Sequence, residues 1–368
     1  MRHLVLGLLA ASSLTSPVLA APVQTLFVIG MENHNLTQPN PSSSPQQILG
    51  NAAAPYLNSL MTPGNANAQY TSYFSNMTNV GQGIHPSEPN YIWQNGGSNF
   101  GVATDADPSS AAHNVISQQS FTGQLTQKGI TWKNYQEDVQ YSSSPTGLTS
   151  ASGNGAVANS FNGSTQYNYA VKHNPAAFFT DSQNHPVQTF SQLQSDLTNN
   201  TYGKYNWITP NQYNDMHSAL SGGFTYNGVH YTGDQAAIAQ GDNFLSQIIP
   251  DIEATTAFQD GTAAIELWWD ESEGGDTSAF TIPEIIISKD AVGNAFDVTE
   301  AVTHSGSLLT DQEIFQVGQC LLASCGATDL SAAFLPGSIP DSVPEPASLA
   351  LLGVGMAGVG FIRRRQRG

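Results

Sequence analysis

The chain has 368 residues, enough for one α/β domain of ordinary size, and carries 28 acidic side chains against 10 basic ones, a formal net charge of −18. All five arginines lie in the terminal segments, so the body of the chain holds five lysines and a net charge of about −22. Such a surface repels nucleic acid and anionic lipid, which excludes both as partners of the body. Without arginine in the body, an anionic substrate would have to be held by a metal, histidine or lysine.

The first 20 residues have the pattern of a signal peptide. Arg2 and His3 precede an apolar stretch over residues 4–11, and residues 18–20 offer a cleavage site before Ala21. We therefore expect the protein to be exported, with a body that begins at residue 21.

Apolar runs alternate with helical patterns along the body, residues 21–337. The expected strands are 25–29, 205–208, 263–269 and 281–287, and the expected helices include 120–128 and 235–249. This alternation predicts an α/β domain with a mostly parallel central sheet flanked by helices. Sheets of this kind form their sites at the carboxyl ends of the strands.

Acidic residues directly follow two of the expected strands. Glu32 and Asn33 come after the first, and Asp270 and Glu271 come after the third. Two strand ends, each with an acid, indicate a single site. Three carboxylates and an amide oxygen would suit a hard cation such as Ca²⁺, Mg²⁺ or Mn²⁺. The alternative is that the first pair caps a helix and the second lies in a solvated turn.

The two cysteines, Cys320 and Cys325, lie close together in the sequence. In the oxidising compartment of an exported protein this spacing favours a disulfide with a short loop. A pair of buried free thiols is the alternative.

The C-terminal segment combines a Pro-Glu-Pro motif at 344–346, an apolar stretch over 347–362 and four arginines at 363–365 and 367. It resembles the PEP-CTERM sorting signal of exported Gram-negative proteins. The apolar stretch is shorter than the roughly 20 residues that span a bilayer, which favours a transient anchor over a permanent one.

The boundaries that follow are a linker over 338–346 and a sorting segment over 347–368. Positive-inside orientation places the arginines in the cytoplasm and the body outside. The resemblance implies a processing partner of the exosortase type, and membrane contact only through this tail. A permanent single-span anchor remains the alternative. The expected location is the cell envelope or the medium, after transient anchoring in the inner membrane.

Five clusters of polar residues occur in a fixed order along the body, at 31–34, 85–91, 169–175, 210–217 and 269–271. In this order they resemble the phosphoesterase family that contains bacterial phospholipases C and bacterial and fungal acid phosphatases, and that is related to the alkaline phosphatase superfamily. The resemblance covers roughly residues 25–315. It implies an alkaline-phosphatase-like fold and a divalent metal held by Glu32, Asn33, Asp270 and Glu271.

The resemblance also implies a hydroxyl nucleophile at the start of a helix that ends in Gly-x-x-Trp. Counting back from Trp132 places that hydroxyl on Ser120, with Thr122 as a second candidate. A helix N-terminus stabilises an alkoxide and phosphoryl oxygens through its free amides. The alternative is that Ser120 only caps the helix.

Two histidines of the clusters are candidates for catalysis. His85, in a His-Pro-Ser-x-Pro-Asn-Tyr motif, would bind a phosphoryl oxygen or protonate the leaving group. His217 matches the family's Asp-His element less closely, because Met216 separates it from Asp215. This departure leaves the role of Asp215, a candidate for substrate binding, open.

Three further residues are candidates for lining the substrate pocket. Lys172 and His173 resemble a Lys-His-Asn-Pro segment of the acid-phosphatase branch, and His304 matches a late His-x-Ser-Leu-Leu segment. For each of them, a structural role in packing is the alternative.

These residues together predict an exported, metal-dependent phosphoesterase in which Ser120 attacks the phosphorus of a phosphate ester and a histidine protonates the leaving oxygen. The Lys-His-Asn-Pro segment favours an acid phosphatase acting on monoesters, with a phospholipase C as the alternative. A second alternative is a non-catalytic surface protein associated with exopolysaccharide, since sorting-tail proteins are often matrix components.

Overall fold

A computed structural model describes residues 22–38, 46–79, 84–144, 146–151, 168–273 and 280–340. The expected signal peptide, the sorting segment and most of the linker lie outside these ranges. Within them, no helix is both long and apolar enough to cross a membrane.

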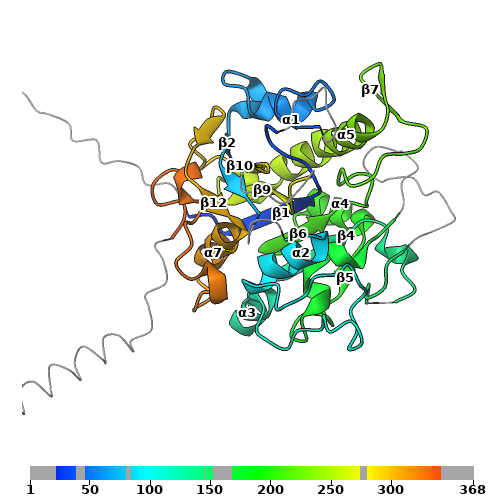
Figure 1. The fold of residues 1–368 in the computed structure, drawn as a ribbon. Coiled ribbons are helices and arrows are strands. Elements are labelled where there is room, and N and C mark those ends of the chain that lie inside the picture. Colours follow the sequence, from blue (N-terminus) through cyan, green and yellow to red (C-terminus); the bar gives the residue numbers. More distant parts are fainter. Residues whose placement is uncertain are drawn as a thin grey trace, which may run out of the picture.

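An eight-stranded sheet forms the centre of the fold, in the order β11-β2-β10-β9-β1-β6-β4-β5 (Figure 1). Its strands are β1 (Thr25–Met31), β2 (Thr71–Phe74), β4 (Trp132–Gln136), β5 (Val187–Gln188), β6 (Tyr205–Thr209), β9 (Ala263–Trp269), β10 (Glu284–Ser288) and β11 (Phe296–Val298). Strand β10 runs antiparallel to both β9 and β2, whereas the other described pairings in this sheet are parallel. The predicted mostly parallel α/β sheet is therefore confirmed, with β10 as its antiparallel member.

Helices cover both faces of the sheet (Figure 1). One group is centred on α5 (Asp234–Glu253), which contacts α1 (Pro55–Leu60), α4 (Phe190–Asn199) and α6 (Thr256–Gln259). The other group comprises α2 (Ser87–Gly96), α3 (Phe121–Lys128) and α7 (His304–Phe315). Two small sheets pair β3 (Met77–Thr78) with β12 (Val302–Thr303) and β7 (Phe224–Tyr226) with β8 (Val229–Tyr231).

Strands β1 and β9 place the expected acids at one edge of the sheet. All seven residues of each strand are buried, as is usual for central parallel strands covered on both faces. Their register pairs Thr25 with Ala263 and Met31 with Trp269, so both strands end at the same level. Glu32, which follows β1, therefore lies beside Asp270, which follows β9.

Three sequence-based boundaries can be compared with the structure. The helix expected over 235–249 is α5, which is longer at both ends, and the strand expected over 281–287 is β10, which begins at Glu284. Ser338, the first residue of the expected linker, is buried, and its carbonyl accepts a hydrogen bond from Val23 N at 2.9 Å. Cys320 and Cys325 form the predicted disulfide, which excludes the free thiols.

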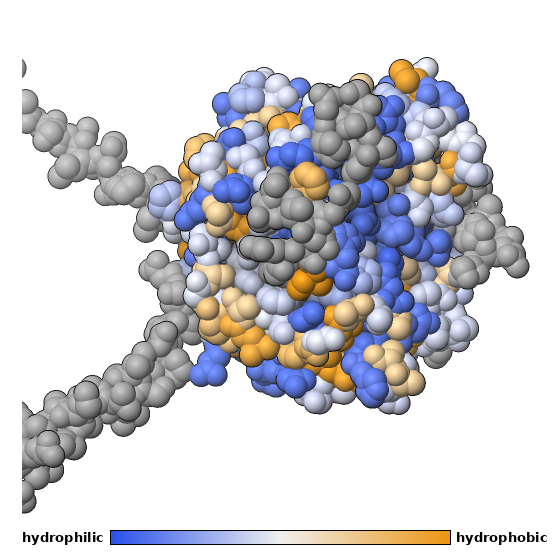
Figure 2. Space-filling view, in the orientation of Figure 1, coloured by the Kyte–Doolittle hydropathy of each residue, from blue (hydrophilic) through white to orange (hydrophobic). Residues whose placement is uncertain are grey.

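Hydrophilic residues cover most of the molecular face in Figure 2, and hydrophobic residues form scattered spots among them. The large hydrophobic side chains exposed on the described surface come from separate segments: Val115, Tyr141, Val229, Val292, Phe296, Leu322 and Leu335. This surface agrees with the acidic composition of the chain.

Candidate active site

The four expected metal ligands come together at the carboxyl ends of β1 and β9. The backbone N of Asn33 donates to Asp270 Oδ1 at 3.1 Å, and its side-chain Nδ2 donates to Glu271 Oε1 at 2.9 Å. Ser87 Oγ connects Glu32 to the same group, at 3.1 Å from Glu32 Oε2 and 3.4 Å from Glu271 Oε1. Residues separated by more than 230 positions in the sequence thus form one buried cluster.

The chemistry of this cluster fits a divalent cation. Asn33 Oδ1 and Asp270 Oδ2 are buried and receive no hydrogen bond from any described residue. Burial raises the pKa of Asp270 well above its usual range, and the negative charges of Glu32 and Glu271 raise it further. Buried carboxylates this close repel one another unless a cation lies between them. Carboxylate and amide oxygens are the ligands that Ca²⁺, Mg²⁺ and Mn²⁺ prefer.

Ser87 is the hydroxyl residue that the structure brings to the cluster, and the sequence analysis did not assign it. Ser87 is almost fully buried. Because it is the first residue of the ten-residue helix α2, its hydroxyl lies at the free backbone amides of the helix N-terminus. Lys172 Nζ lies 3.5 Å from Ser87 Oγ on another side. The signal in the sequence is the His-Pro-Ser motif, in which Ser87 follows His85 by two positions.

Ser120 has a different environment from the one expected of a nucleophile. It is the N-cap of α3, where its Oγ accepts a hydrogen bond from Gly123 N at 2.9 Å and donates one to Asp181 Oδ1 at 2.7 Å. Thr122 Oγ1 lies 3.1 Å from Asn95 Oδ1. Among the described residues, the hydrogen bonds of these two hydroxyls do not include the acidic cluster. The structure therefore agrees with the capping alternative for Ser120.

His85 joins the cluster from its outer side. Its Nδ1 lies 2.9 Å from Glu271 Oε1, and about a third of its side chain is exposed. The hydrogen bond to Glu271 raises the pKa of His85 despite partial burial. This histidine is thus both protonated more readily than usual and accessible to a ligand.

Lys172 and His217 form a second side of the site. Lys172 Nζ lies 2.9 Å from Asp105 Oδ2 and 3.3 Å from His217 Nε2. Burial lowers the pKa of His217 to about 4, so its imidazole is neutral at pH 7. A neutral imidazole can accept a hydrogen bond from the lysine ammonium, which fixes the position of that ammonium beside Ser87.

His173 lies between two buried carboxylates, behind the cluster. Its Nε2 is 2.9 Å from Glu32 Oε1 and its Nδ1 is 3.2 Å from Asp215 Oδ2. Burial lowers the pKa of His173, but the two acids outweigh burial and raise it to about 9. His173 is therefore an imidazolium that neutralises Glu32, and Asp215 contacts this imidazolium.

His304 is fully buried at the start of α7. Its Nε2 lies 2.8 Å from the carbonyl of Trp269, the residue before Asp270, and its ring packs on Trp268 with the ring centroids 4.6 Å apart. Burial lowers the pKa of His304 to about 4. These contacts agree with the structural alternative, because the ring holds the end of β9 in place.

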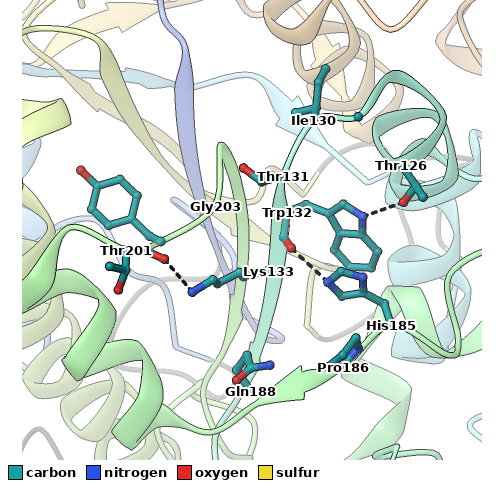
Figure 3. Close-up of a pocket in the computed structure, with 12 residues that line it drawn as sticks. Thr126, Ile130, Thr131, Trp132, Lys133, His185, Pro186, Gln188, Thr201 and Gly203 are labelled. Carbon is teal, nitrogen blue, oxygen red and sulfur yellow. Dashed lines mark hydrogen bonds between the residues drawn. The ribbon is translucent and has the colours of Figure 1, made fainter.

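A separate pocket of about 530 Å³ lies at the opposite edge of the sheet, at the amino ends of β4 and β6 (Figure 3). Its polar side chains are engaged in local contacts. Lys133 Nζ donates to Asp196 Oδ2 and to Thr201 O, each at 2.6 Å, and His185 Nε2 lies 3.0 Å from Trp132 O. Because the acidic cluster lies at the carboxyl ends of the strands, this pocket is not the candidate site.

Comparison with known proteins adds to this geometry. The model of the Phosphoesterase family matches residues 71–284, and that of the PEP-CTERM protein-sorting motif matches residues 342–366, as the resemblance predicted. The second match indicates an exported protein with a sorting tail and implies processing of the exosortase type.

Named relatives point in the same direction. A phosphatidylinositol-3-phosphatase of Mycobacterium tuberculosis is 25% identical over 313 residues, which is 84% of this chain and 87% of that protein. A phosphate-repressible acid phosphatase of Penicillium chrysogenum is 31% identical over 146 residues, 38% of this chain and 32% of that protein. The chain thus spans about a third of the fungal acid phosphatases that it matches.

The fold also resembles that of a solved structure. A provisionally assigned sulfatase of Bacteroides thetaiotaomicron has a TM-score of 0.50 at 10% identity, covering 84% of this chain and 74% of that one. At this identity the similarity concerns the fold alone. Because the family model covers more than half of the chain, including Ser87, His217, Asp270 and Glu271, the chain belongs to the Phosphoesterase family.

Proposed function

We propose that this protein is an exported hydrolase of phosphate esters, with Ser87 in place of Ser120 as the nucleophile. The observation that carries the proposal is the position of Ser87 Oγ, at the N-terminus of α2, within 3.5 Å of Glu32, Glu271 and Lys172. A hydroxyl in such a position lies next to the carboxylates that would hold a metal. It also lies next to the ammonium of Lys172, whose positive charge would bind a phosphoryl oxygen.

Glu32, Asn33, Asp270 and Glu271 would hold the divalent cation, for which their oxygen atoms fit. When bound, the cation supplies positive charge that lowers the pKa of a nearby hydroxyl and polarises a phosphoryl oxygen. His173 keeps Glu32 ionised for this purpose: the charge and hydrogen bond of His173 outweigh burial and hold the pKa of Glu32 well below its usual range.

In the first step Ser87 Oγ gives its proton to Glu32 Oε2, 3.1 Å away, and forms a bond to phosphorus while the bond from phosphorus to the leaving oxygen breaks. The free amides at the start of α2 and the ammonium of Lys172 stabilise the phosphoryl oxygens. His85, accessible and held protonated by Glu271, donates a proton to the leaving oxygen. Water then attacks phosphorus and gives one proton to His85, the bond to Ser87 breaks, Ser87 Oγ takes its proton back from Glu32, and hydrogen phosphate leaves.

We propose phosphomonoesters as the substrates, since the named relatives are phosphatases and the mycobacterial one aligns with most of the chain. A phospholipase C acting on diesters remains the second candidate. Hydrolysis rates for p-nitrophenyl phosphate, bis-p-nitrophenyl phosphate and phosphatidylcholine decide between them. A non-catalytic exopolysaccharide-associated protein would hydrolyse none of the three, with or without added Ca²⁺, Mg²⁺ or Mn²⁺.

The nucleophile is tested by comparing Ser87→Ala with Ser120→Ala. We expect Ser87→Ala to lower the turnover of p-nitrophenyl phosphate by several orders of magnitude, as loss of a nucleophile does in other hydrolases. Ser120→Ala is the matched control, and its folded fraction should keep full turnover. Loss of turnover confined to Ser120→Ala would return the nucleophile to α3. Wild-type turnover in both variants would exclude both serines as the nucleophile.

We further propose that the body works outside the inner membrane after transient anchoring by the tail. The part of the body that the structure describes carries all the groups named above, and Val23 N already pairs with Ser338 O. Truncation after Asp341 should therefore give a soluble protein with the same turnover. An insoluble or inactive product would show that the tail belongs to the body.

A further inference from the structure

A second cluster of metal-binding side chains lies beside the candidate active site. His34, Asp234 and Glu273 each offer one ligand atom, and these atoms all lie within 4.8 Å of one another. They come from three segments: the turn after β1, the first residue of α5 and the turn after β9. Two of these segments also carry active-site residues, since His34 follows Glu32 by two positions and Glu273 follows Glu271 by two.

The orientation of His34 points to a ligand role for its second nitrogen. Nδ1 lies 3.0 Å from the carbonyl of Glu32, and a carbonyl can only accept, so Nδ1 carries a proton. Nε2 faces the carboxylates, at 3.2 Å from Asp234 Oδ1, to which it donates a hydrogen bond when no ion is bound, and at 3.9 Å from Glu273 Oε2. Histidines that bind metals are usually oriented in this way, by a hydrogen bond from the other ring nitrogen to a carbonyl or carboxylate.

Both carboxylates are also held in place by their surroundings. Asp234 Oδ2 accepts a hydrogen bond from Gln46 N at 2.6 Å, which leaves Oδ1 toward His34. The backbone of Glu273 is bound on both sides by Asn35, whose Nδ2 donates to Glu273 O at 3.1 Å and whose Oδ1 accepts from Glu273 N at 3.0 Å. Glu273 Oε2 is buried and receives no hydrogen bond from any described residue.

We propose that His34, Asp234 and Glu273 bind a second divalent ion, of the Zn²⁺ class, at a site separate from the cation held by Glu32, Asn33, Asp270 and Glu271. Ligand atoms around tetrahedral zinc lie about 3.4 Å apart, given bonds of about 2.1 Å, and the separations from Nε2 lie on either side of this value. An imidazole with two carboxylates selects zinc-like ions over Ca²⁺ or Mg²⁺. The partial exposure of Glu273 leaves room for water as a fourth ligand.

Zinc bound at this position would fasten the segments after β1 and β9 to the start of α5. Its role would therefore be to hold the active-site residues in place, and the active-site oxygens would keep their own cation. This inference does not depend on the proposed hydrolysis, because it concerns a different set of ligands.

The experiment counts zinc bound to the purified protein after chelator treatment and equilibrium dialysis against Zn²⁺. We expect two ions per chain in the wild type, one in Asp270→Asn, one in His34→Gln and none in the double variant. His230→Gln, which removes an exposed histidine of β8, is the matched control and should bind two. If His34→Gln binds as much zinc as His230→Gln, the site does not exist.

Cobalt provides a readout that is independent of activity and of zinc counting. Co²⁺ at a tetrahedral site with a nitrogen ligand gives strong visible absorption, which we expect in wild type and Asp270→Asn but not in His34→Gln. If His34→Gln does not fold, Glu273→Gln serves instead, and its dissociation constant for Zn²⁺ should rise at least about tenfold. An unchanged dissociation constant would mean that His34 is an imidazolium paired with Asp234, and would overturn the proposal.

Discussion

Two buried groups of carboxyls share strand β9 and differ in what surrounds them. The active-site group follows the end of the strand and meets the imidazoles of His85 and His173, the ammonium of Lys172 and the oxygen atoms that fit a cation. The core group lies halfway along the strand, where Glu266 interacts with Glu284 and Asp311.

The core group has no basic partner among the described residues. Glu266 pairs in register with Ile286, so Glu284, two positions away on β10, lies diagonally beside it on the same face of the sheet. Asp311 reaches the pair from α7 and accepts a hydrogen bond from Gln94 Nε2 at 3.3 Å. Burial raises the pKa of Glu284 and of Asp311 well above the usual range.

This difference shows that burial has opposite consequences for a carboxyl, depending on its neighbours. Where imidazolium and ammonium are close, as around Glu32, they outweigh burial and lower the pKa of the carboxyl. Where only other carboxyls and amides are close, as around Glu284, burial raises the pKa of the carboxyl. We therefore expect the active site to be sensitive to metal removal and the core to be sensitive to alkaline pH.

The largest expected effect is in the active-site group. Asp270→Asn removes a ligand charge, so we expect turnover of p-nitrophenyl phosphate to fall by at least about a thousandfold, together with loss of the hard cation. Glu266→Gln in the core is the comparison variant and should keep both turnover and metal. Metal analysis and turnover of the two proteins check this, and an Asp270→Asn protein with wild-type metal content would show that the site is elsewhere.

His173 tests whether the active-site carboxylates need their imidazolium. His173→Gln leaves Glu32 and Asp215 buried with no cation between them, so we expect the free energy of unfolding at pH 7 to fall by roughly 3–5 kcal/mol. Urea unfolding measures it. His230→Gln, at the surface, is the control and should change the free energy by less than about 0.5 kcal/mol. An equal effect in both variants would contradict the ion pairs of His173.

The core group should respond to pH in a defined direction. Since the pKa of Glu284 is raised in the folded state, its stability contribution is full below the unfolded value of about 4.3 and is lost as pH rises through the folded pKa. Glu284→Gln removes this loss. The free energy of unfolding of the variant should therefore fall less steeply as pH rises, and its slope should differ from that of the wild type by up to about 1.4 kcal/mol per pH unit.

Urea unfolding of Glu284→Gln at a series of pH values from 5 to 9 gives this slope. The exposed Glu300→Gln is the control for loss of one acidic residue and should follow the wild type. Parallel curves for all three proteins would mean that Glu284 is not held as a neutral acid.

The smallest expected effect concerns Ser120, whose carboxylate partner Asp181 is exposed and belongs to neither group. Ser120→Ala removes the cap of α3, so we expect a loss of about 0.5–2 kcal/mol in the free energy of unfolding. Thr189→Ala, which removes the equivalent cap of α4, should give a loss of similar size. A much larger loss in Ser120→Ala alone would indicate that Ser120 does more than cap its helix.

The sequence alone determined the parts of the site that depend on local pattern. Glu32 and Asp270 could be placed at one edge because apolar runs of strand length precede both, and parallel strands bring their carboxyl ends together. The disulfide and the mostly parallel sheet followed from spacing and alternation in the same way. The antiparallel direction of β10 did not, since pairing direction is set by where the chain returns to the sheet.

Only the tertiary structure decided which hydroxyl reaches the site. Ser87 and Ser120 both begin helices, so local sequence describes them equally well, and their difference lies in what surrounds each helix start. The same holds for Glu266, which the sequence placed in an apolar strand. Burial raises the pKa of Glu266, and hydrogen bonds to Glu284 and Asp311, which come from other elements, lower it, because the pKa of a buried acid is set by the groups that the fold brings around it.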